Sequence, residues 1–160
     1  MTIKIGVLSD THIPTRASNL PEEIFEIFQN VQYIIHAGDY VSLSVIEELE
    51  KIAPVIGCHG NMDPYNLKNQ LPRIATLEVE ENIIKIIHDL SGRSQLKKLQ
   101  KSGPVNIIIH GHTHRMSVEK WESILILNPG SATNSFLTPD SIGLLYLAPN
   151  DVDYELIELK

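Results

Sequence analysis

Short apolar runs rich in isoleucine and valine alternate along the chain with longer amphipathic stretches. The runs with the length and residue types of buried strands are 3–9, 33–38, 54–58 and 105–110. The stretches with apolar residues at helical spacing are 21–30, 42–52 and 94–103. This alternation predicts an α/β domain with parallel strands.

Local signals set further expected boundaries. Ser44 and Glu47 have the spacing of a capping box for the helix over 42–52. Segment 74–88 is typical of a hairpin that turns at Glu81-Asn82. Three later segments are expected as antiparallel strands joined by turns: 116–127, 142–148 and 152–159. No repeat or linker interrupts the pattern, so we expect a single domain over 1–160.

Composition narrows the class of protein. The formal net charge of -7 disfavours a long nucleic acid as partner, although metal ions can still hold a small phosphorylated ligand. The single cysteine, Cys58, fits a reducing compartment. The start of the chain lacks the features of a secretory signal, and no apolar run approaches the length of a membrane span. We therefore expect a cytoplasmic protein without a membrane partner; the oligomeric state is not indicated.

Metal-ligand side chains follow five of the apolar runs. These side chains are Asp10, His12, Asp39, Asn61, His88, His112 and His114. In α/β sheets, sites form outside the carboxyl ends of the strands, so these residues are expected to meet at one edge. Carboxylate, imidazole and amide groups suit divalent metals of intermediate hardness.

The spacing of these residues favours two metal ions. In an extended chain, residues two apart point to the same side, so Asp10 can act with His12, and His112 with His114. Seven ligand groups are too many for one tetrahedral ion. They suit two ions about 3.5–4 Å apart, with the carboxylate of Asp39 as the natural bridge.

The ordered set "DTH…GD…GNMD…H…GHTH" resembles the calcineurin-like metallophosphoesterase superfamily, and is most similar to its small bacterial and archaeal phosphodiesterase branch. The resemblance extends from Lys4 to about Tyr146. It implies a four-layer αββα sandwich, in which two mixed β-sheets pack face to face with flanking helices.

The resemblance also implies a ligand set and a reaction. One ion would be held by Asp10, His12, Asp39 and His114, and the other by Asp39, Asn61, His88 and His112. A hydroxide bridging the two ions would attack phosphorus in line and hydrolyse a small phosphodiester, such as a nucleotide-derived one. Manganese is the expected metal, with nickel, zinc and iron as alternatives. The expected catalytic residues are Asn61, His112 and Asp63, and Asp63 has either an acid or a structural role.

The chain departs from the family pattern at two positions. Met62 stands where the protein-phosphatase branch has a histidine after Gly-Asn, which disfavours a protein phosphatase or other phosphomonoesterase. Asp89 follows His88 where the family usually has glycine, and it adds bulk and negative charge near the second metal.

A second function remains open, because segments 10–21 and 128–133 also resemble the small retromer subunit, a scaffold with the same fold. In that interpretation the chain binds metal and a partner protein with little or no turnover. Segment 128–131 is expected either to line the site or to form a plain turn. The other histidines, His36, His59 and His110, are expected to support the ligands.

Basic residues outside the ligand set are candidates for contacts with substrate phosphate. Arg115, which follows the last ligand, is the better candidate. Arg16 and Arg73 contact either substrate or solvent. The basic residues of the helix over 94–103 are expected to form a solvated face.

Overall fold

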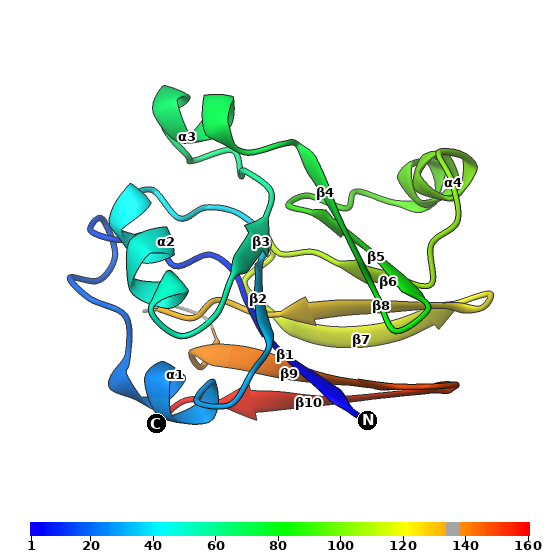
Figure 1. Ribbon diagram of the computed structural model, residues 1–160. Helices are drawn as coiled ribbons and strands as arrows, with labels where there is room; N and C mark the ends of the chain where they lie inside the picture. Colours follow the sequence, from blue (N-terminus) through cyan, green and yellow to red (C-terminus); the bar gives the residue numbers. More distant parts are fainter. Residues whose placement is uncertain (134–137) are drawn as a thin grey trace.

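The computed structural model describes residues 1–133 and 138–160 and contains two five-stranded β-sheets with helices on their outer faces (Figure 1). The sheets have the orders β10-β9-β1-β2-β3 and β4-β5-β6-β8-β7. The strands are β1 Ile3–Leu8, β2 Tyr33–His36, β3 Val55–Gly57, β4 Ile74–Val79, β5 Asn82–Ile87, β6 Ile107–Ile109, β7 Met116–Trp121, β8 Ile124–Pro129, β9 Ser141–Ala148 and β10 Asp151–Glu158. The helices are α1 Glu22–Ile27, α2 Leu43–Glu50, α3 Tyr65–Gln70 and α4 Arg93–Lys101. The predicted αββα sandwich is confirmed.

Each sheet contains three neighbouring parallel strands. These are β1, β2 and β3 in one sheet and β5, β6 and β8 in the other. The remaining strands, β4, β7, β9 and β10, pair antiparallel with their neighbours. Since parallel strands end at the same edge, the segments that follow β1, β2 and β3 emerge side by side, as do those that follow β5 and β6.

The core lies in three apolar layers, and each parallel strand contributes to two of them. On β6, Ile107 and Ile109 pack between the sheets, whereas Ile108 packs under α4 with Leu96 and Leu99. The outer face of the first sheet packs against α1 and α2. A strand that is buried on both faces needs a continuous apolar run, which explains the "III" of β6.

Most elements expected from the apolar pattern are present, but four details were wrong. The hairpin expected to turn at Glu81-Asn82 turns one residue earlier, at Glu80 and Glu81, since Val79 pairs with Asn82. Segment 116–127 is a hairpin, β7 and β8, which turns at Glu122 with φ of 57°, and β8 runs parallel to β6. Helix α3 was not expected. The N-cap of α2 is Ser42, whose hydroxyl accepts the N–H of Ser44, because the chain enters the helix two residues earlier than the capping-box spacing indicated.

No helix within the described part of the chain has both the length and the apolar character needed to cross a membrane.

A buried histidine at the end of β2 ties together the segments that follow β1 and β2. His36 Nδ1 accepts the N–H of Gly38 at 3.1 Å, which leaves Nε2–H to donate to Thr11 Oγ1 at 3.1 Å. The ring stacks on Tyr40 with centroids 3.7 Å apart. Burial lowers the pKa of His36 to about 3, so the ring stays neutral. The expected supporting role of His36 agrees with these contacts.

This neutral ring predicts a pH dependence of stability. The pKa of His36 is about 3 in the folded protein, and an unfolded histidine has a pKa of about 6.5. Between these values only the unfolded state binds the proton, so the free energy of unfolding falls as pH drops below about 6.5. We expect His36→Gln to flatten this slope by about 1.4 kcal/mol per pH unit.

The measurement is urea unfolding at intervals between pH 4.5 and 7, with His59→Gln, at a less buried histidine, as the matched control. An unchanged slope in the His36 variant would show that the acid sensitivity comes from other groups.

Candidate metal centre

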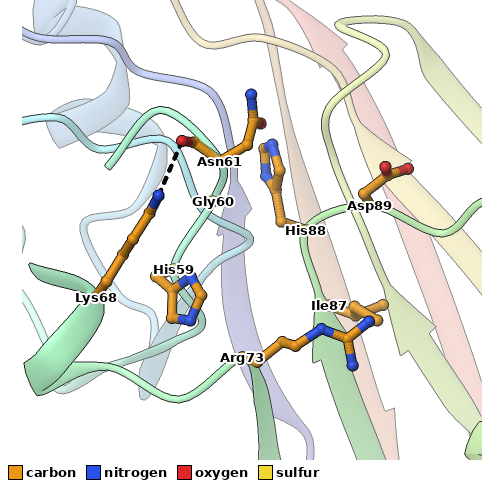
Figure 2. A pocket seen from close by; sticks show the side chains of 8 residues that line it. All are labelled: His59, Gly60, Asn61, Lys68, Arg73, Ile87, His88 and Asp89. Atoms are coloured by element: carbon orange, nitrogen blue, oxygen red, sulfur yellow. Dashed lines mark hydrogen bonds between the residues drawn. The ribbon is translucent and has the colours of Figure 1, made fainter. Parts of the chain in front are cut away.

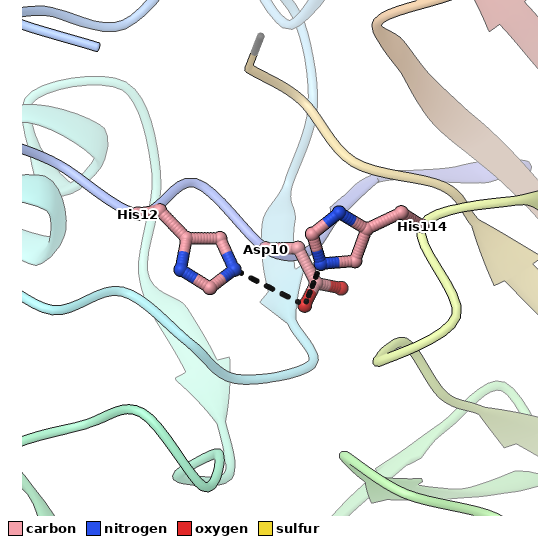
Figure 3. A group of neighbouring side chains, drawn as sticks. All are labelled: Asp10, His12 and His114. Carbon is pink, nitrogen blue, oxygen red and sulfur yellow. Dashed lines mark ion pairs between the residues drawn. The ribbon is translucent and has the colours of Figure 1, made fainter. Parts of the chain in front are cut away.

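Five of the seven expected ligands meet where the parallel strands end. Two sets have ligand atoms that all lie within 4.8 Å of one another: Asp10, His12 and His114 in one set (Figure 3), and Asp10, Asp39 and His88 in the other. Asp10 and His12 follow β1, Asp39 follows β2, and His88 follows β5. His114 lies in the segment between β6 and β7. Residues far apart in the sequence therefore form one cluster.

Two carboxylate oxygens form the middle of the cluster. His12 Nε2 lies 3.6 Å from Asp10 Oδ1 and 3.5 Å from Asp39 Oδ2. His88 Nε2 lies 3.1 Å from Asp39 Oδ2 and 3.9 Å from Asp10 Oδ1. His114 Nε2 lies 3.3 Å from Asp10 Oδ1. Each carboxylate thus faces imidazoles on two sides.

Three buried atoms of this cluster have no hydrogen-bond partner in the described part of the chain: Asp10 Oδ1, His12 Nε2 and His88 Nε2. A buried polar atom without a partner is costly, and such atoms call for an explanation. Cations held between them would satisfy all three atoms. The mixed oxygen and imidazole set fits divalent metal ions.

Hydrogen bonds on the far side of each carboxylate fix its orientation. Asp10 Oδ2 accepts the Ser9 hydroxyl at 2.7 Å and the N–H of His112 at 3.0 Å. Asp39 Oδ1 accepts the N–H of Met62 at 2.8 Å. Asp10 Oδ1 and Asp39 Oδ2 are consequently left for the centre. Such outer contacts orient metal ligands in proteins.

His88 is oriented in the same way. Its Nδ1 donates to the carbonyl of Ala37 at 2.7 Å, so Nε2 is the atom that faces the carboxylates. Burial opposes protonation of His88, but the nearby carboxylates of Asp39 and Asp10 outweigh it and raise its pKa to about 9. A metal ion therefore has to displace a proton from this ring at neutral pH.

The same charges act on Asp10. Burial disfavours its ionised form, yet the neighbouring imidazoles of His114, His12 and His88 hold its pKa well below the ordinary range. The carboxylate thus remains available as an anionic ligand at neutral pH.

Glycines near the cluster allow close approach of the backbone. A Cβ at Gly60 would collide with Asp39 Oδ1, and one at Gly111 would collide with Ser9 Oγ. Larger residues at these positions would push the carboxylate-bearing segments apart.

Many of the expected ligands hold a left-handed backbone, which side-chain patterns do not reveal. Positive φ angles occur at five of the seven: Asp10, 54°; His12, 44°; Asp39, 61°; His112, 71°; and His114, 62°. This region is uncommon for residues other than glycine, although Asp, Asn and His are enriched in it. Such strain persists where the surrounding structure fixes it, and it gathers at functional sites.

The two remaining expected ligands lie at the exposed rim. Asn61 and His88 line one pocket with a volume of about 210 Å³ (Figure 2). The ring centroid of His112 lies 5.2 Å from that of His88. His112 belongs to neither of the two close sets.

Asp63 lies behind the centre and joins two segments. Its Oδ2 accepts the N–H groups of Asp39 and Gly60 at 3.0 and 2.7 Å, and its Oδ1 accepts that of Val41 at 2.7 Å. The residue is 3% exposed. Asp63 thereby fixes the segment after β2 against the segment after β3.

Several supporting contacts were not expected from the sequence. Lys68, on the unexpected helix α3, donates to the backbone carbonyl of Asn61 at 3.1 Å (Figure 2). Arg16 Nη1 lies 3.2 Å from His114 Nδ1. The sequence signal that could have located Lys68 is the short segment between Pro64 and Pro72, which forms α3.

Segment 128–131 supports the ligand segments from behind. Asn128 Nδ2 donates to the carbonyl of Gly111 at 3.2 Å and to Thr113 Oγ1 at 3.0 Å. The hydroxyl of Ser131 donates to the carbonyl of Asp10 at 2.8 Å. His110 is also largely buried, and burial lowers its pKa to about 4.

Comparison with known proteins agrees with this geometry. Residues 3–149 match the family model described as the calcineurin-like phosphoesterase superfamily domain. A probable metallophosphoesterase of Methanothermobacter thermautotrophicus is 39% identical over 158 residues, covering 96% of this chain and 91% of that protein. A protein of Methanocaldococcus jannaschii named as a phosphodiesterase is 33% identical over 159 residues, covering 89% and 92%.

Among solved structures, vacuolar protein sorting 29 from Cryptosporidium parvum superposes with a TM-score of 0.87 at 26% identity, covering 99% of this chain and 92% of that one. This structural likeness extends over nearly the full length of the chain, and so do the matches to both sequence relatives. The protein therefore belongs to the calcineurin-like phosphoesterase superfamily.

Proposed function

We propose that the protein is a two-metal phosphodiesterase that hydrolyses small phosphodiesters. The family supports metal-dependent hydrolysis of a phosphoester, and one relative is named as a phosphodiesterase. The observation that carries the proposal is the set of buried, unpartnered atoms of Asp10, His12 and His88, which face one another across the two carboxylates.

Asp10, His12, Asp39 and His114 hold one ion in this proposal, and Asp39, Asn61, His88 and His112 hold the other. Two bound divalent ions would supply a reactive water at neutral pH and offset charge on the phosphoryl oxygens. The chain's own residues do the positioning. Asn61 is at the exposed rim, where its amide can donate to a substrate oxygen, and Lys68 holds the backbone there. The hydrogen bonds behind Asp10 and Asp39 keep both carboxylates in place.

Asp89 favours a diester over a monoester in this proposal. It is exposed and lines the same pocket as His88. A phosphomonoester is a dianion near neutral pH and a diester is a monoanion, so the negative charge of Asp89 repels the monoester more strongly.

The alternative is a metal-binding scaffold for a partner protein, which the likeness to vacuolar protein sorting 29 favours. A scaffold should present an apolar patch away from the metal centre. The large apolar side chains most exposed in the described part of the chain are Met1, Met62, Tyr65, Val118 and Tyr154. Two of these flank Asp63 beside the candidate centre, and the others lie at the N-terminus, on β7 and on β10. Phosphodiesterase activity therefore remains the function that we favour.

Substitution of two metal ligands tests the centre. We expect chelator-stripped protein to regain hydrolysis of bis(4-nitrophenyl) phosphate when manganese, nickel, zinc or iron is restored. Asn61→Ala and His88→Ala should each lower kcat/KM about 100-fold, because each removes a metal ligand. Asn66→Ala, at an exposed asparagine of α3, is the matched control.

A metal-induced rise in melting temperature without turnover of any ester would instead support the scaffold. Turnover that survives both ligand substitutions would place the reaction elsewhere.

Substitution of Asp89 tests its selection against monoesters. We expect Asp89→Asn to raise the kcat/KM for 4-nitrophenyl phosphate relative to the diester about fivefold, since it removes about 1 kcal/mol more repulsion from the dianion than from the monoanion. Asp153→Asn, on the edge strand β10, is the charge-matched control. Equal ratios in the wild type and the Asp89 variant would rule out this selection.

Substitution of Asp63 separates a positioning role of this residue from a general-acid role. We expect Asp63→Asn to lower the free energy of unfolding by about 1–3 kcal/mol, because three backbone N–H groups lose their carboxylate acceptor. Its loss of kcat/KM should be the same for bis(4-nitrophenyl) phosphate and for thymidylyl-(3′→5′)-thymidine. A general acid would matter far more for the dinucleotide, whose leaving alkoxide needs a proton.

A further inference from the structure

A second pocket adjoins the one beside His88. It lies against α4, has a volume of about 320 Å³, and shares Arg73 and Ile87 with the first pocket. Figure 2 shows the side chain of Arg73 next to Ile87, below His88 in that view. We call the first the metal-side pocket and the second the α4 pocket. The two pockets therefore meet at Arg73 and Ile87.

Two cations in the α4 pocket have no acidic partner. Within residues 1–133 and 138–160, neither Arg73 nor Lys98 forms an ion pair or a side-chain hydrogen bond. Helix α4 contains four basic residues and no acidic one. In a chain with a net charge of -7, this is a local concentration of unpaired positive charge.

The α4 pocket also contains neutral hydrogen-bond donors. Gln95 Oε1 accepts both the N–H and the hydroxyl of Ser91, at 2.7 and 3.2 Å, which leaves the Gln95 NH₂ group for a ligand. Ser94 contributes a hydroxyl group to the lining, whereas the hydroxyl of Ser102 already donates to the carbonyl of Leu99 at 2.7 Å. Guanidinium, ammonium, amide and hydroxyl donors together match the oxygens of a phosphate group.

We propose that the α4 pocket binds a second phosphate group of the substrate through Arg73 and Lys98, so that the preferred substrate is a phosphodiester carrying a further phosphate. This inference rests on the proposed function for its substrate class. It assigns Arg73 to the substrate, and it removes Lys98 from the solvated helix face that the sequence indicated. Asp89 fits the same scheme, because it disfavours a dianion at the metal centre while the α4 pocket accepts one.

The test compares matched substrates. Thymidylyl-(3′→5′)-thymidine and its 5′-phosphorylated and 3′-phosphorylated forms differ only in the terminal phosphate. We expect the wild type to prefer one phosphorylated form by at least about tenfold in kcat/KM, mainly through a lower KM. The double variant Arg73→Gln/Lys98→Met should reduce this ratio to near one.

A charge-matched control is the double variant Arg93→Gln/Lys97→Met, which also removes two positive charges. Both residues lie on α4 and outside both pockets, so this variant should keep the wild-type ratio. The proposal is overturned if the wild type shows no preference for either phosphorylated form, or if the double variant keeps the preference.

A binding measurement separates this proposal from the proposed function. Thymidine 3′,5′-bisphosphate contains no diester, and its binding to chelator-stripped protein can be followed by calorimetry. We expect the double variant to bind it at least about tenfold more weakly than the wild type does. Such a loss, without turnover of bis(4-nitrophenyl) phosphate, would support the phosphate site and reject the phosphodiesterase. Turnover of that diester, with equal binding of the bisphosphate by the wild type and the double variant, would support the phosphodiesterase and reject the phosphate site.

Discussion

Two carboxylates and three imidazoles lie together below the rim of the sandwich, and folding has to offset the cost of removing them from water. The surrounding structure does this with directed hydrogen bonds. Ser9 and the His112 backbone contact one oxygen of Asp10, the Met62 backbone contacts one oxygen of Asp39, and Ala37 orients His88. Protonation of His88 offsets part of the negative charge while no cation is bound, and a divalent ion would replace that proton.

This compensation depends on the sheet topology. Parallel strands from both sheets end beside the centre, so each ligand segment leaves a rigid strand shortly before it reaches the cluster. Asp63 then fixes the segments after β2 and β3, and Asn128 and Ser131 hold those after β6 and β1. The ligands are thereby positioned by contacts that span most of the chain.

Short-range patterns indicated an α/β domain and the polar positions at the strand ends, whereas the two-sheet sandwich was expected from the family resemblance. Apolar runs marked the buried strands, and polar residues directly after them marked the centre. Helix α3 escaped prediction because it spans only Tyr65–Gln70 and has one buried side chain, Leu67. A segment of this length is too short to show a helical period. The turn at Glu122 escaped because neither glycine nor asparagine marks its left-handed residue. The contacts that Asp63 and Lys68 make are with backbone groups of the ligand segments, and no periodic side-chain pattern encodes them.

The left-handed backbone at the ligand positions has a consequence for how such a chain can diverge. At Asp10, Asp39 and His112 the main chain itself selects for a few residue types, because Asp, Asn, His and glycine reach positive φ at the lowest cost. A lineage that ceased to use the metal would still be constrained to these residues. Drift would run through Asp-to-Asn or His-to-Asn exchanges and reach alanine or leucine only with a change in the path of the loop.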